Sequence, residues 1–501
     1  MIELERKPQH GQFFDVTIES VSRKGVGQAK LHVCIGPQRL ERTYTVEVRK
    51  VLPGELVRIR VEAMRRRVIT AAAEEILTPA PERIEPRCKH FGWRDIPGKG
   101  CGGCVLQAMD YQGQLNLKRS VVQECMRKAG LDQVEVAQVL PSRSPWYYRN
   151  KMEFSFGDDR QRRFALGFFP SGWHREVIAL EECFLCSEYV SNLVPRVRQW
   201  FEDQGVEYFS SRRDEGFLRV FTVREGKRTG ERMAELITTP DEEVKTVDGV
   251  KPAAEVVAAF AQALQEICVE LGEPLTSLHW TQHVARRGER TRMETHHIAG
   301  QPVLHEELHL PRGHVLRFEI HPRAFFQPNT LQAEVLYGEV IRAAGLSEGS
   351  GARVLDLYCG TGTIGLCLAP YAAHVTGVEL VPEGVENARH NAKLNGLDNV
   401  TFFAGDAGEV LAGPLADQQG KFDLVVVDPP RSGLMPQARK HIAALGAPRL
   451  VYVSCNPNTL ARDLAELMAD GHRLVSLQPV DMFPHTAHIE NVALLERVSE
   501  P

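Results

Sequence analysis

Cys455, near the C-terminus, lies where a side chain can take part in a reaction. Cys455 lies in the stretch Ser-Cys-Asn-Pro, directly after the apolar run 450–453. Such a run predicts a buried strand, so Cys455 is expected at the end of that strand. A thiolate at a strand end is a strong candidate nucleophile. The alternative is an inert thiol in the core, which is common for free cysteines. Because Cys455 follows the strand, we favour the nucleophile.

A glycine-rich loop in the same half of the chain predicts a cofactor site. Gly360, Gly362 and Gly365 follow the expected strand 354–357 and open a helix, whose N-terminus would face a bound ligand. Glu379 ends the next expected strand, where its carboxylate can accept hydrogen bonds from both ribose hydroxyls. These features fit NAD as well as S-adenosylmethionine.

The sequence Asp-Pro-Pro-Arg at 428–431 favours S-adenosylmethionine over NAD. It follows the apolar run 422–427, which is expected to be the fourth strand. Asp428 and two prolines form a rigid loop with few N–H groups between cofactor and substrate. This loop is typical of methyltransferases that act on a planar base, and a hydride-transfer site has no need of it. The alternative is that Asp428 only caps the next helix.

Cys455 would have a specific task in methylation of uracil. Carbon 5 of uracil is a poor nucleophile, but addition of a thiolate to carbon 6 makes it an enolate carbon that can take a methyl group. A general base must then remove the proton from carbon 5. Glu490, in His-Ile-Glu-Asn between the last two expected strands, is the best placed candidate by chain order. A purely structural role for this carboxylate stays open.

Alternating helices and strands position these residues in the C-terminal part of the chain. Their spacing predicts a doubly wound, mostly parallel sheet, completed at one edge by a final pair of strands. The expected helices are 331–344, 364–369, 383–395, 436–445 and 460–470, and the expected strands are 354–357, 375–378, 400–403, 422–427, 450–453, 473–477 and 492–497.

The rest of the chain predicts two further domains. Short β-branched runs with turns between them indicate a small β-barrel over residues 9–76. Its arginine run 65–67 suits phosphates, or it keeps an edge strand from aggregating. Residues 77–325 predict a central α+β domain with helices at 111–129 and 253–271. The fold class is therefore α/β, with a Rossmann-like C-terminal domain over residues 326–501.

Composition indicates an ordinary globular protein. The 501 residues are 43% hydrophobic and 25% charged, and no run of eighteen apolar residues occurs. The N-terminal residues lack the apolar stretch of a signal peptide, so we expect a cytoplasmic protein without a membrane partner. Residues 1–200 hold 32 Lys and Arg against 24 Asp and Glu, which is compatible with binding a polyanion or with a solvated surface.

The motifs together resemble the RNA uracil-5-methyltransferase family. The resemblance extends over nearly the whole chain, including a TRAM-like barrel and Phe-Phe-Gln-Pro-Asn at 325–329. It implies S-adenosylmethionine-dependent methylation of carbon 5 of a uridine in structured RNA, with Cys455 as nucleophile and Glu490 as proton acceptor. The residues that it implies for S-adenosylmethionine are Gln327, Tyr358, Glu379, Asp406 and Asp428, with Asp406 near the adenine.

The resemblance also implies an iron–sulfur cluster. Eleven cysteines in a reducing compartment indicate metal ligands or nucleophiles. Family members with a Cys-x-x-Cys segment carry a [4Fe–4S] cluster, and the matching residues are Cys88, Cys101, Cys104 and Cys183. Four thiolates also suit zinc. Residues 89–100 form a longer loop than is usual, so Cys186 stays open as a replacement for Cys183.

Several further expectations follow from the resemblance. The cluster and the barrel favour 23S ribosomal RNA as the substrate, with transfer RNA as the alternative, and we expect a monomer. A non-catalytic RNA-binding iron–sulfur protein would not need Cys455, Glu490 and Asp428 together. An N-methyltransferase would need no thiol, and it usually has an aromatic residue at the position of Arg431.

Overall fold

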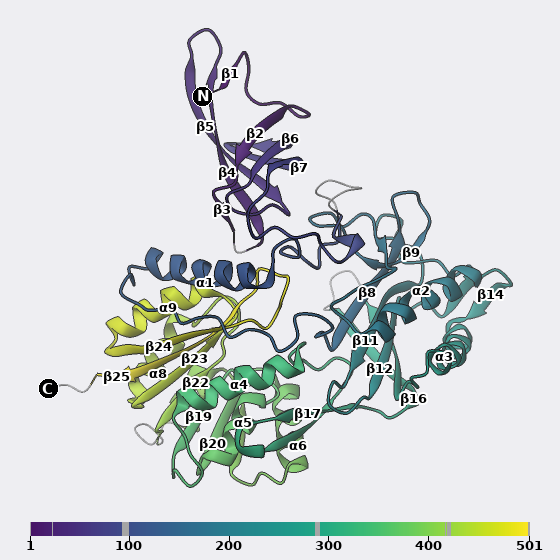
Figure 1. Ribbon diagram of the computed structural model, residues 1–501. Coiled ribbons are helices and arrows are strands. Elements are labelled where there is room, and N and C mark those ends of the chain that lie inside the picture. Colours follow the sequence, from purple (N-terminus) through teal and green to yellow (C-terminus); the bar gives the residue numbers. More distant parts are fainter. Residues whose placement is uncertain are drawn as a thin grey trace.

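The computed structural model describes residues 2–22, 24–92, 100–285, 291–415, 417 and 422–498. Three large sheets dominate the molecule (Figure 1). Most of the predicted long loop at 89–100, namely residues 93–99, lies outside the described residues. In the described part, no helix is long and apolar enough to cross a membrane.

The N-terminal sheet is curled and barrel-like, as predicted (Figure 1). Its strands follow the order β1-β4-β5-β7-β6-β2, with β3 paired to β4. Alternate residues such as Val57 and Ile59 are fully buried, whereas Arg58 faces outward and binds Asp15. The bounds are β1 Ile2–Leu4, β2 Phe13–Thr17, β3 Ser20–Val21, β4 Val26–Ile35, β5 Leu40–Arg49, β6 Leu56–Arg65 and β7 Val68–Thr78.

A second sheet, of order β10-β9-β8-β11-β12-β15-β16, forms the centre of the chain. Helices α2 (Glu188–Asp203) and α3 (Ala253–Glu270) pack on one face of it, with Phe154 and Phe221 in the shared core (Figure 1). The strand bounds are β8 Lys151–Asp158, β9 Phe164–Phe168, β10 Ile178–Ala179, β11 Leu218–Glu225, β12 Arg232–Thr238, β15 Ser277–Val284 and β16 Arg292–Gly300. One hairpin, β13 Glu243–Thr246 with β14 Gly249–Pro252, lies in sequence between β12 and α3, and a second, β17 Leu304–His309 with β18 Val315–Ile320, follows β16.

The C-terminal sheet has the predicted doubly wound topology. Its order is β21-β20-β19-β22-β23-β25-β24, and β25 alone among these strands runs antiparallel to its neighbours, β23 and β24. The strands are β19 Arg353–Leu357, β20 His374–Glu379, β21 Val400–Ala404, β22 Leu424–Val427, β23 Arg449–Ser454, β24 His472–Val480 and β25 Glu490–Arg497. The helices are α4 Thr330–Ala344, α5 Thr363–Leu368, α6 Pro382–Leu394, α7 Ala407–Ala412, α8 Pro436–Leu445 and α9 Pro457–Ala469. Short 3-10 turns occur at Lys89–Phe91, Pro311–Gly313 and Ala369–Tyr371.

Helix α1 (Tyr111–Lys128) joins the central segment to the C-terminal sheet (Figure 1). Its buried residues Val122 and Met126 share an apolar cluster with Leu460 and Leu464 of α9. Leu140 forms an isolated bridge with Val480 at the end of β24. Residues 111–140 therefore pack against the C-terminal unit, and the predicted limits of the three domains stay a prediction.

Candidate active site

The carboxyl ends of neighbouring parallel strands bring the predicted site residues to one edge of the C-terminal sheet. Tyr358 follows β19, Glu379 ends β20, Asp428 follows β22 and Cys455 follows β23. In open sheets of this type, ligands bind at this edge. The edge therefore combines a candidate nucleophile with the candidate cofactor residues.

Cys455 and Glu490 lie at the same end of two antiparallel strands. The register pairs Ser454, the last residue of β23, with Asn491 of β25; Cys455 follows the first of these residues and Glu490 precedes the second. The charge of Glu490 acts on the Cys455 thiol, so the two groups are near each other. Asn491 also donates a hydrogen bond from Nδ2 to the Ser454 carbonyl at 3.3 Å. Strand pairing thus holds a thiol and a carboxyl group side by side.

Burial gives both groups unusual acid–base properties. The pKa of Glu490 is raised to about 8, mainly by burial and also by the charge of Asp428, while the charge of Arg431 opposes the rise. Burial also raises the pKa of Cys455, as does Glu490, whereas a hydrogen bond from Arg431 lowers it. A carboxyl group with a pKa near neutrality is well suited to proton transfer.

Arg431 is a functional residue that the sequence did not single out as part of the site. Its guanidinium interacts with both Cys455 and Glu490, so it favours the charged form of each. Its carbonyl accepts a hydrogen bond from Asn456 Nδ2 at 2.8 Å, which fixes the loop beside the thiol. The available signal was its place in Asp-Pro-Pro-Arg, where an aromatic residue is common in enzymes that methylate amines.

Asp428 lies between the cofactor loop and the thiol. Burial raises its pKa to about 7. The alternative role as a helix cap is wrong, because Met435 is the N-cap of α8 and this cap makes no side-chain hydrogen bond. Its carboxyl group is therefore available to a ligand.

The glycine loop fits a nucleoside cofactor. Gly360 and Gly362 have φ angles of 56° and 76°, which favour glycine. A Cβ atom at Gly362 would come within 2.8 Å of the Ala388 side chain, whereas the space beside Gly360 is open. Glu379 accepts hydrogen bonds from the amides of Gly360 at 3.0 Å and Val381 at 2.9 Å, which fix its carboxylate behind the loop. The loop thus leaves room for a ligand beside an oriented carboxylate.

Asp356 is a second residue that the sequence did not assign. Its Oδ2 accepts a hydrogen bond from the Gly365 amide at 2.8 Å. Its Oδ1 is buried and has no partner among the described residues. Burial raises its pKa to about 8. An unpaired buried oxygen beneath the glycine loop is a site that a bound cofactor or its water can satisfy.

The remaining predicted cofactor residues have defined surroundings. Tyr358 has a φ of 63°, and burial raises its pKa. Asn150 of the central segment donates a hydrogen bond of 2.8 Å to the Gln327 carbonyl, which fixes the backbone at this residue. Asp406 caps α7 through Oδ1, which accepts from the Gly408 amide at 2.8 Å. The structure therefore gives Asp406 a local role in addition to the predicted one.

Buried polar contacts hold the segment 481–488 that leads to Glu490. Lys118 of α1 donates hydrogen bonds to Asp481 Oδ1 at 2.6 Å and to the Phe483 carbonyl at 3.0 Å. Gln114 of α1 accepts a hydrogen bond from the His485 amide at 2.8 Å. The Val105 amide, next to Cys104, donates to the His485 carbonyl at 2.9 Å. The segment is thus fixed by α1 and by the cysteine segment.

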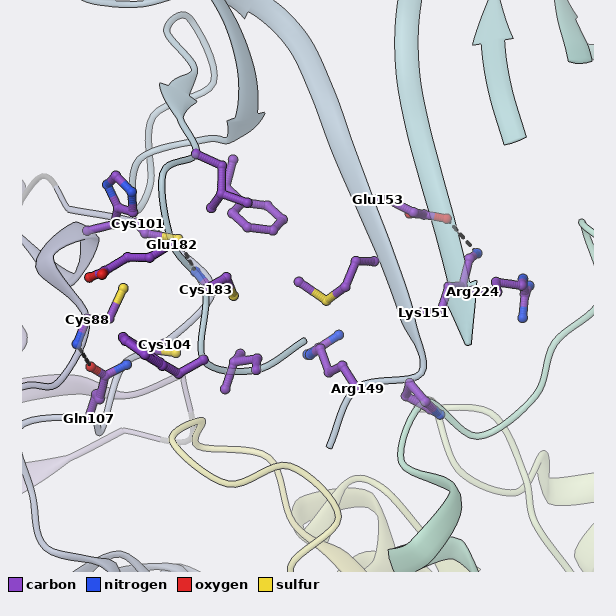
Figure 2. Close-up of a pocket in the computed structure, with 18 of the residues that line it drawn as sticks. Cys88, Cys101, Cys104, Gln107, Arg149, Lys151, Glu153, Glu182, Cys183 and Arg224 are labelled. Atoms are coloured by element: carbon purple, nitrogen blue, oxygen red, sulfur yellow. Dashed lines mark hydrogen bonds and ion pairs between the residues drawn. The ribbon is translucent and has the colours of Figure 1, made fainter. Parts of the chain in front are cut away.

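The four predicted ligand cysteines line one cavity of about 490 Å³ (Figure 2). Burial raises the pKa of Cys104, and the charges of Cys101, Cys183 and Cys88 contribute to the rise, so the four thiols act on one another across this cavity. Cys186 instead belongs to the apolar core with α2 and α3. The geometry therefore groups Cys183, and not Cys186, with the other three.

In the described part of the chain, no three His, Cys, Asp or Glu side chains converge closely enough to hold one metal ion. Zinc would draw four sulfur atoms within 2.3 Å of one point. Thiols spread around a cavity suit a larger group. Lys50, which follows β5, is buried beside them with its ammonium on the carbonyls of Phe91 and Cys101, and this positive charge suits an anionic group.

Comparison with known proteins relates the chain to enzymes that act on RNA. Residues 260–498 match the family model described as tRNA (uracil-5-)-methyltransferase. An uncharacterized RNA methyltransferase of Protochlamydia amoebophila is 37% identical, over 90% of this chain and 99% of its own length. One of Caldanaerobacter subterraneus is 34% identical, over 97% of this chain and 99% of its own length.

A solved structure shares the fold over almost the whole chain. It is the Pyrococcus abyssi tRNA (uracil-54, C5)-methyltransferase in complex with S-adenosyl-L-homocysteine. The two chains are 26% identical and superpose with a TM-score of 0.70, over 96% of this chain and 99% of the other. The likeness therefore includes the N-terminal and central sheets as well as the C-terminal one.

Proposed function

The chain belongs to the family of RNA uracil-5-methyltransferases, and from this premise we propose that it methylates carbon 5 of a uridine in RNA through a covalent adduct at Cys455. The observation that carries the proposal is the placement of Cys455 and Glu490 at the same end of β23 and β25, with Arg431 hydrogen-bonded to the thiol and its charge acting on Glu490. A thiol, a base and a cation at the carboxyl edge of the sheet are the groups that this reaction needs.

Each group has one task in the reaction. The Cys455 thiolate, stabilised by Arg431, forms a bond to carbon 6, and the electron pair of the ring double bond moves onto the carbonyl at carbon 4. S-adenosylmethionine, when bound, supplies the methyl group that carbon 5 accepts. The Glu490 carboxylate then takes the proton from carbon 5, the ring double bond re-forms, and the bond between sulfur and carbon 6 breaks. This returns Cys455 as a thiolate and leaves Glu490 protonated.

The methyl donor would be held by the glycine loop and the neighbouring strand ends. Glu379 has the orientation to bind ribose hydroxyls, and Gly360 leaves space beside it. Gln327, Tyr358 and Asp428 complete the proposed set, with Asp406 near the adenine. The solved relative was crystallised with S-adenosyl-L-homocysteine, which supports this choice of donor.

We propose a [4Fe–4S] cluster held by Cys88, Cys101, Cys104 and Cys183. The shared cavity and the buried ammonium of Lys50 support a group that is larger than one ion and negatively charged. The cluster would stabilise the segment that contacts His485 and thus the approach to Glu490.

For the substrate we propose 23S ribosomal RNA, bound in part by a TRAM-like barrel over residues 9–76. Transfer RNA is the second candidate, and the solved relative, a tRNA enzyme, favours it. The test is to map 5-methyluridine by mass spectrometry in ribosomal and transfer RNA from a strain that lacks this protein. Loss of one 23S site, restored by the gene and not by a Cys455→Ala form, is the expected result. Loss of a transfer RNA site would select the second candidate, and unchanged 5-methyluridine in both RNAs would contradict the function.

A further inference from the structure

A groove on the central sheet combines aromatic rings with positive charge. It has a volume of about 880 Å³ and lies between the turn 169–177, which joins β9 to β10, and the segment 208–212 before β11. Trp173, with 41% of its surface exposed, lies on one side, and Phe209 lies on the other. The groove shares no lining residue with the cysteine cavity, and Cys455 does not line it.

Guanidinium groups accompany both rings. The Arg219 guanidinium is 4.2 Å from the Phe209 ring centre, and that of Arg175 is 5.5 Å from the Trp173 ring centre. Arg175, Arg212 and Arg219 make no ion pair with any residue that the structure describes, although the charge of Asp214 acts on Arg219. Of the two carboxylates that line the groove, Asp158 pairs with Arg162, and the other is Glu176. Rings for stacking next to an excess of positive charge are the features that bind single-stranded nucleic acid.

The groove continues the surface that leads from the cysteine cavity. Along β8, Lys151 and Glu153 line the cysteine cavity, whereas Ser155 lines the groove. Alternate residues of a strand face the same side of a sheet, so these three share one face, the one opposite the face that α2 and α3 cover. Lys151 and Ser155 are about 13 Å apart at 3.3 Å per residue. Figure 2 shows Lys151 with Arg149 and Arg224 at the end of the cysteine cavity away from the four thiols.

We propose that this groove binds a single-stranded segment of the substrate RNA, with bases stacked on Trp173 and Phe209 and phosphates on Arg175, Arg212 and Arg219. The proposal rests on the proposed function, because it takes RNA as the substrate. A single strand fits better than a duplex, since stacking on side chains requires bases that are not paired. The groove would hold nucleotides outside the target uridine, so it contributes affinity and choice of RNA without touching the reacting atoms.

The test measures binding of the full-length protein to a fluorescent single-stranded uridine 12-mer at several salt concentrations, without a methyl donor. The variant Arg175→Gln with Arg212→Gln should lower the slope of log affinity against log salt by about 1.4, because each contact to a single strand contributes about 0.7. Trp173→Ala should weaken binding about five- to one-hundredfold. The matched control is Arg196→Gln with Lys251→Gln, which removes two exposed cations that pair with Glu270 and Asp248. It should bind like the unchanged protein.

A second measurement does not depend on any variant. Photo-crosslinking of the unchanged protein to a 4-thiouridine 12-mer should label peptides from 169–177 and 208–219. Crosslinks that avoid both segments, or equal binding by the groove variant and its control, would overturn the proposal. Tighter binding of polyglutamate than of the RNA, lost in the groove variant, would overturn it in favour of a protein partner.

Methylation assays keep this proposal distinct from the proposed function. With substrate RNA, the groove variants should raise KM and leave kcat unchanged. A protein that binds the 12-mer through the groove but forms no 5-methyluridine in any RNA would refute the proposed function alone. A protein that methylates RNA with the same KM in all variants would refute the groove alone.

Discussion

Cys455 is proposed to form the covalent bond to RNA, and Glu490 is proposed to allow its release. Substitution of Cys455 should therefore prevent the covalent complex, whereas substitution of Glu490 should make it accumulate. In Glu490→Gln the thiolate can still add to carbon 6, but the proton on carbon 5 has no acceptor. We therefore expect a covalent enzyme–RNA complex to accumulate while turnover falls about 10²- to 10⁴-fold, the usual range for loss of a general base. Denaturing gel electrophoresis of the variant with radiolabelled RNA measures the complex. Fast release of methylated RNA would show that another group is the base.

The pH dependence of methylation should reveal the effect of Arg431 on the pKa values of Cys455 and Glu490. The thiol and the carboxyl group both have raised pKa values and both act deprotonated, so kcat/KM should rise with pH through the Glu490 pKa of about 8 and level off only above the higher pKa of the Cys455 thiol. Arg431 lowers both pKa values, so Arg431→Met should move this rise to higher pH, and Arg431→Lys should move it less. The measurement is the pH profile of single-turnover methylation. A profile that keeps its position in Arg431→Met would contradict the assigned role.

At the residue scale, most of the site could be predicted because the residues proposed to react or bind lie directly after strands. Asp428 and Cys455 come directly after apolar runs, and parallel strands bring such positions together. The contact of Arg431 with the thiol could not be predicted in this way, since it depends on how the loop folds back on Asn456.

At the scale of elements, the segment 481–488 depends on a buried ion pair. Lys118 and Asp481 have 2% and 0% of their side chains exposed. Removal of one partner leaves an unpaired buried charge, so Lys118→Met should destabilise the fold by about 3–5 kcal/mol.

Because the pair fixes the segment before Glu490, Lys118→Met should also lower kcat more than it raises KM. Thermal melting and steady-state kinetics measure the two effects. The control is Arg127→Met, which breaks an exposed pair with Glu124 on the same helix and should leave both unchanged. A destabilised Lys118→Met enzyme with full kcat would show that the pair does not position the segment.

Elements with strong periodicity were predicted well. Helix α8 lies at Pro436–Leu445 as expected, and α3 begins at Ala253 as expected. Helix α2 was missed, since Pro195 lies inside it and proline usually ends a helix. In the N-terminal sheet, the β-branched runs 14–18, 43–48 and 55–61 predicted β2, β5 and β6, but β4 and β7 were missed. Their pattern is interrupted by polar residues or is rich in alanine, so it does not stand out from a loop.

At the scale of the whole molecule, the cysteine cavity joins three parts of the chain. Lys50 follows β5 of the N-terminal sheet. Cys104 precedes Val105, whose amide donates to the His485 carbonyl, and Cys183 lies shortly before α2. Such convergence could not be predicted from spacing, because Lys50 and Cys183 are far in the sequence from the segment 88–104. Family resemblance supplied the set, and the packing of α1 against α9 became visible only in the fold.

The metal content tests this arrangement. Protein purified without oxygen should contain four iron and four sulfide per chain, with the visible absorption of a cluster. Cys183→Ala should lose most of the iron, whereas Cys186→Ala, which removes a core thiol, should keep it. Elemental analysis and absorption spectra measure both. One zinc per chain, or loss of iron only in Cys186→Ala, would contradict the proposed ligand set.

The central claim is that Cys455 bonds to the target uridine during methylation. The most direct measurement uses substrate RNA in which 5-fluorouridine replaces uridine, because fluorine on carbon 5 cannot leave as a proton. With S-adenosylmethionine, the protein should form a stable complex whose peptide mass spectrum places one methylated 5-fluorouridine on Cys455. The Cys455→Ala form should give no complex and no methylation, while it still binds the methyl donor. Methylation by Cys455→Ala, or an adduct on a different cysteine, would contradict the account.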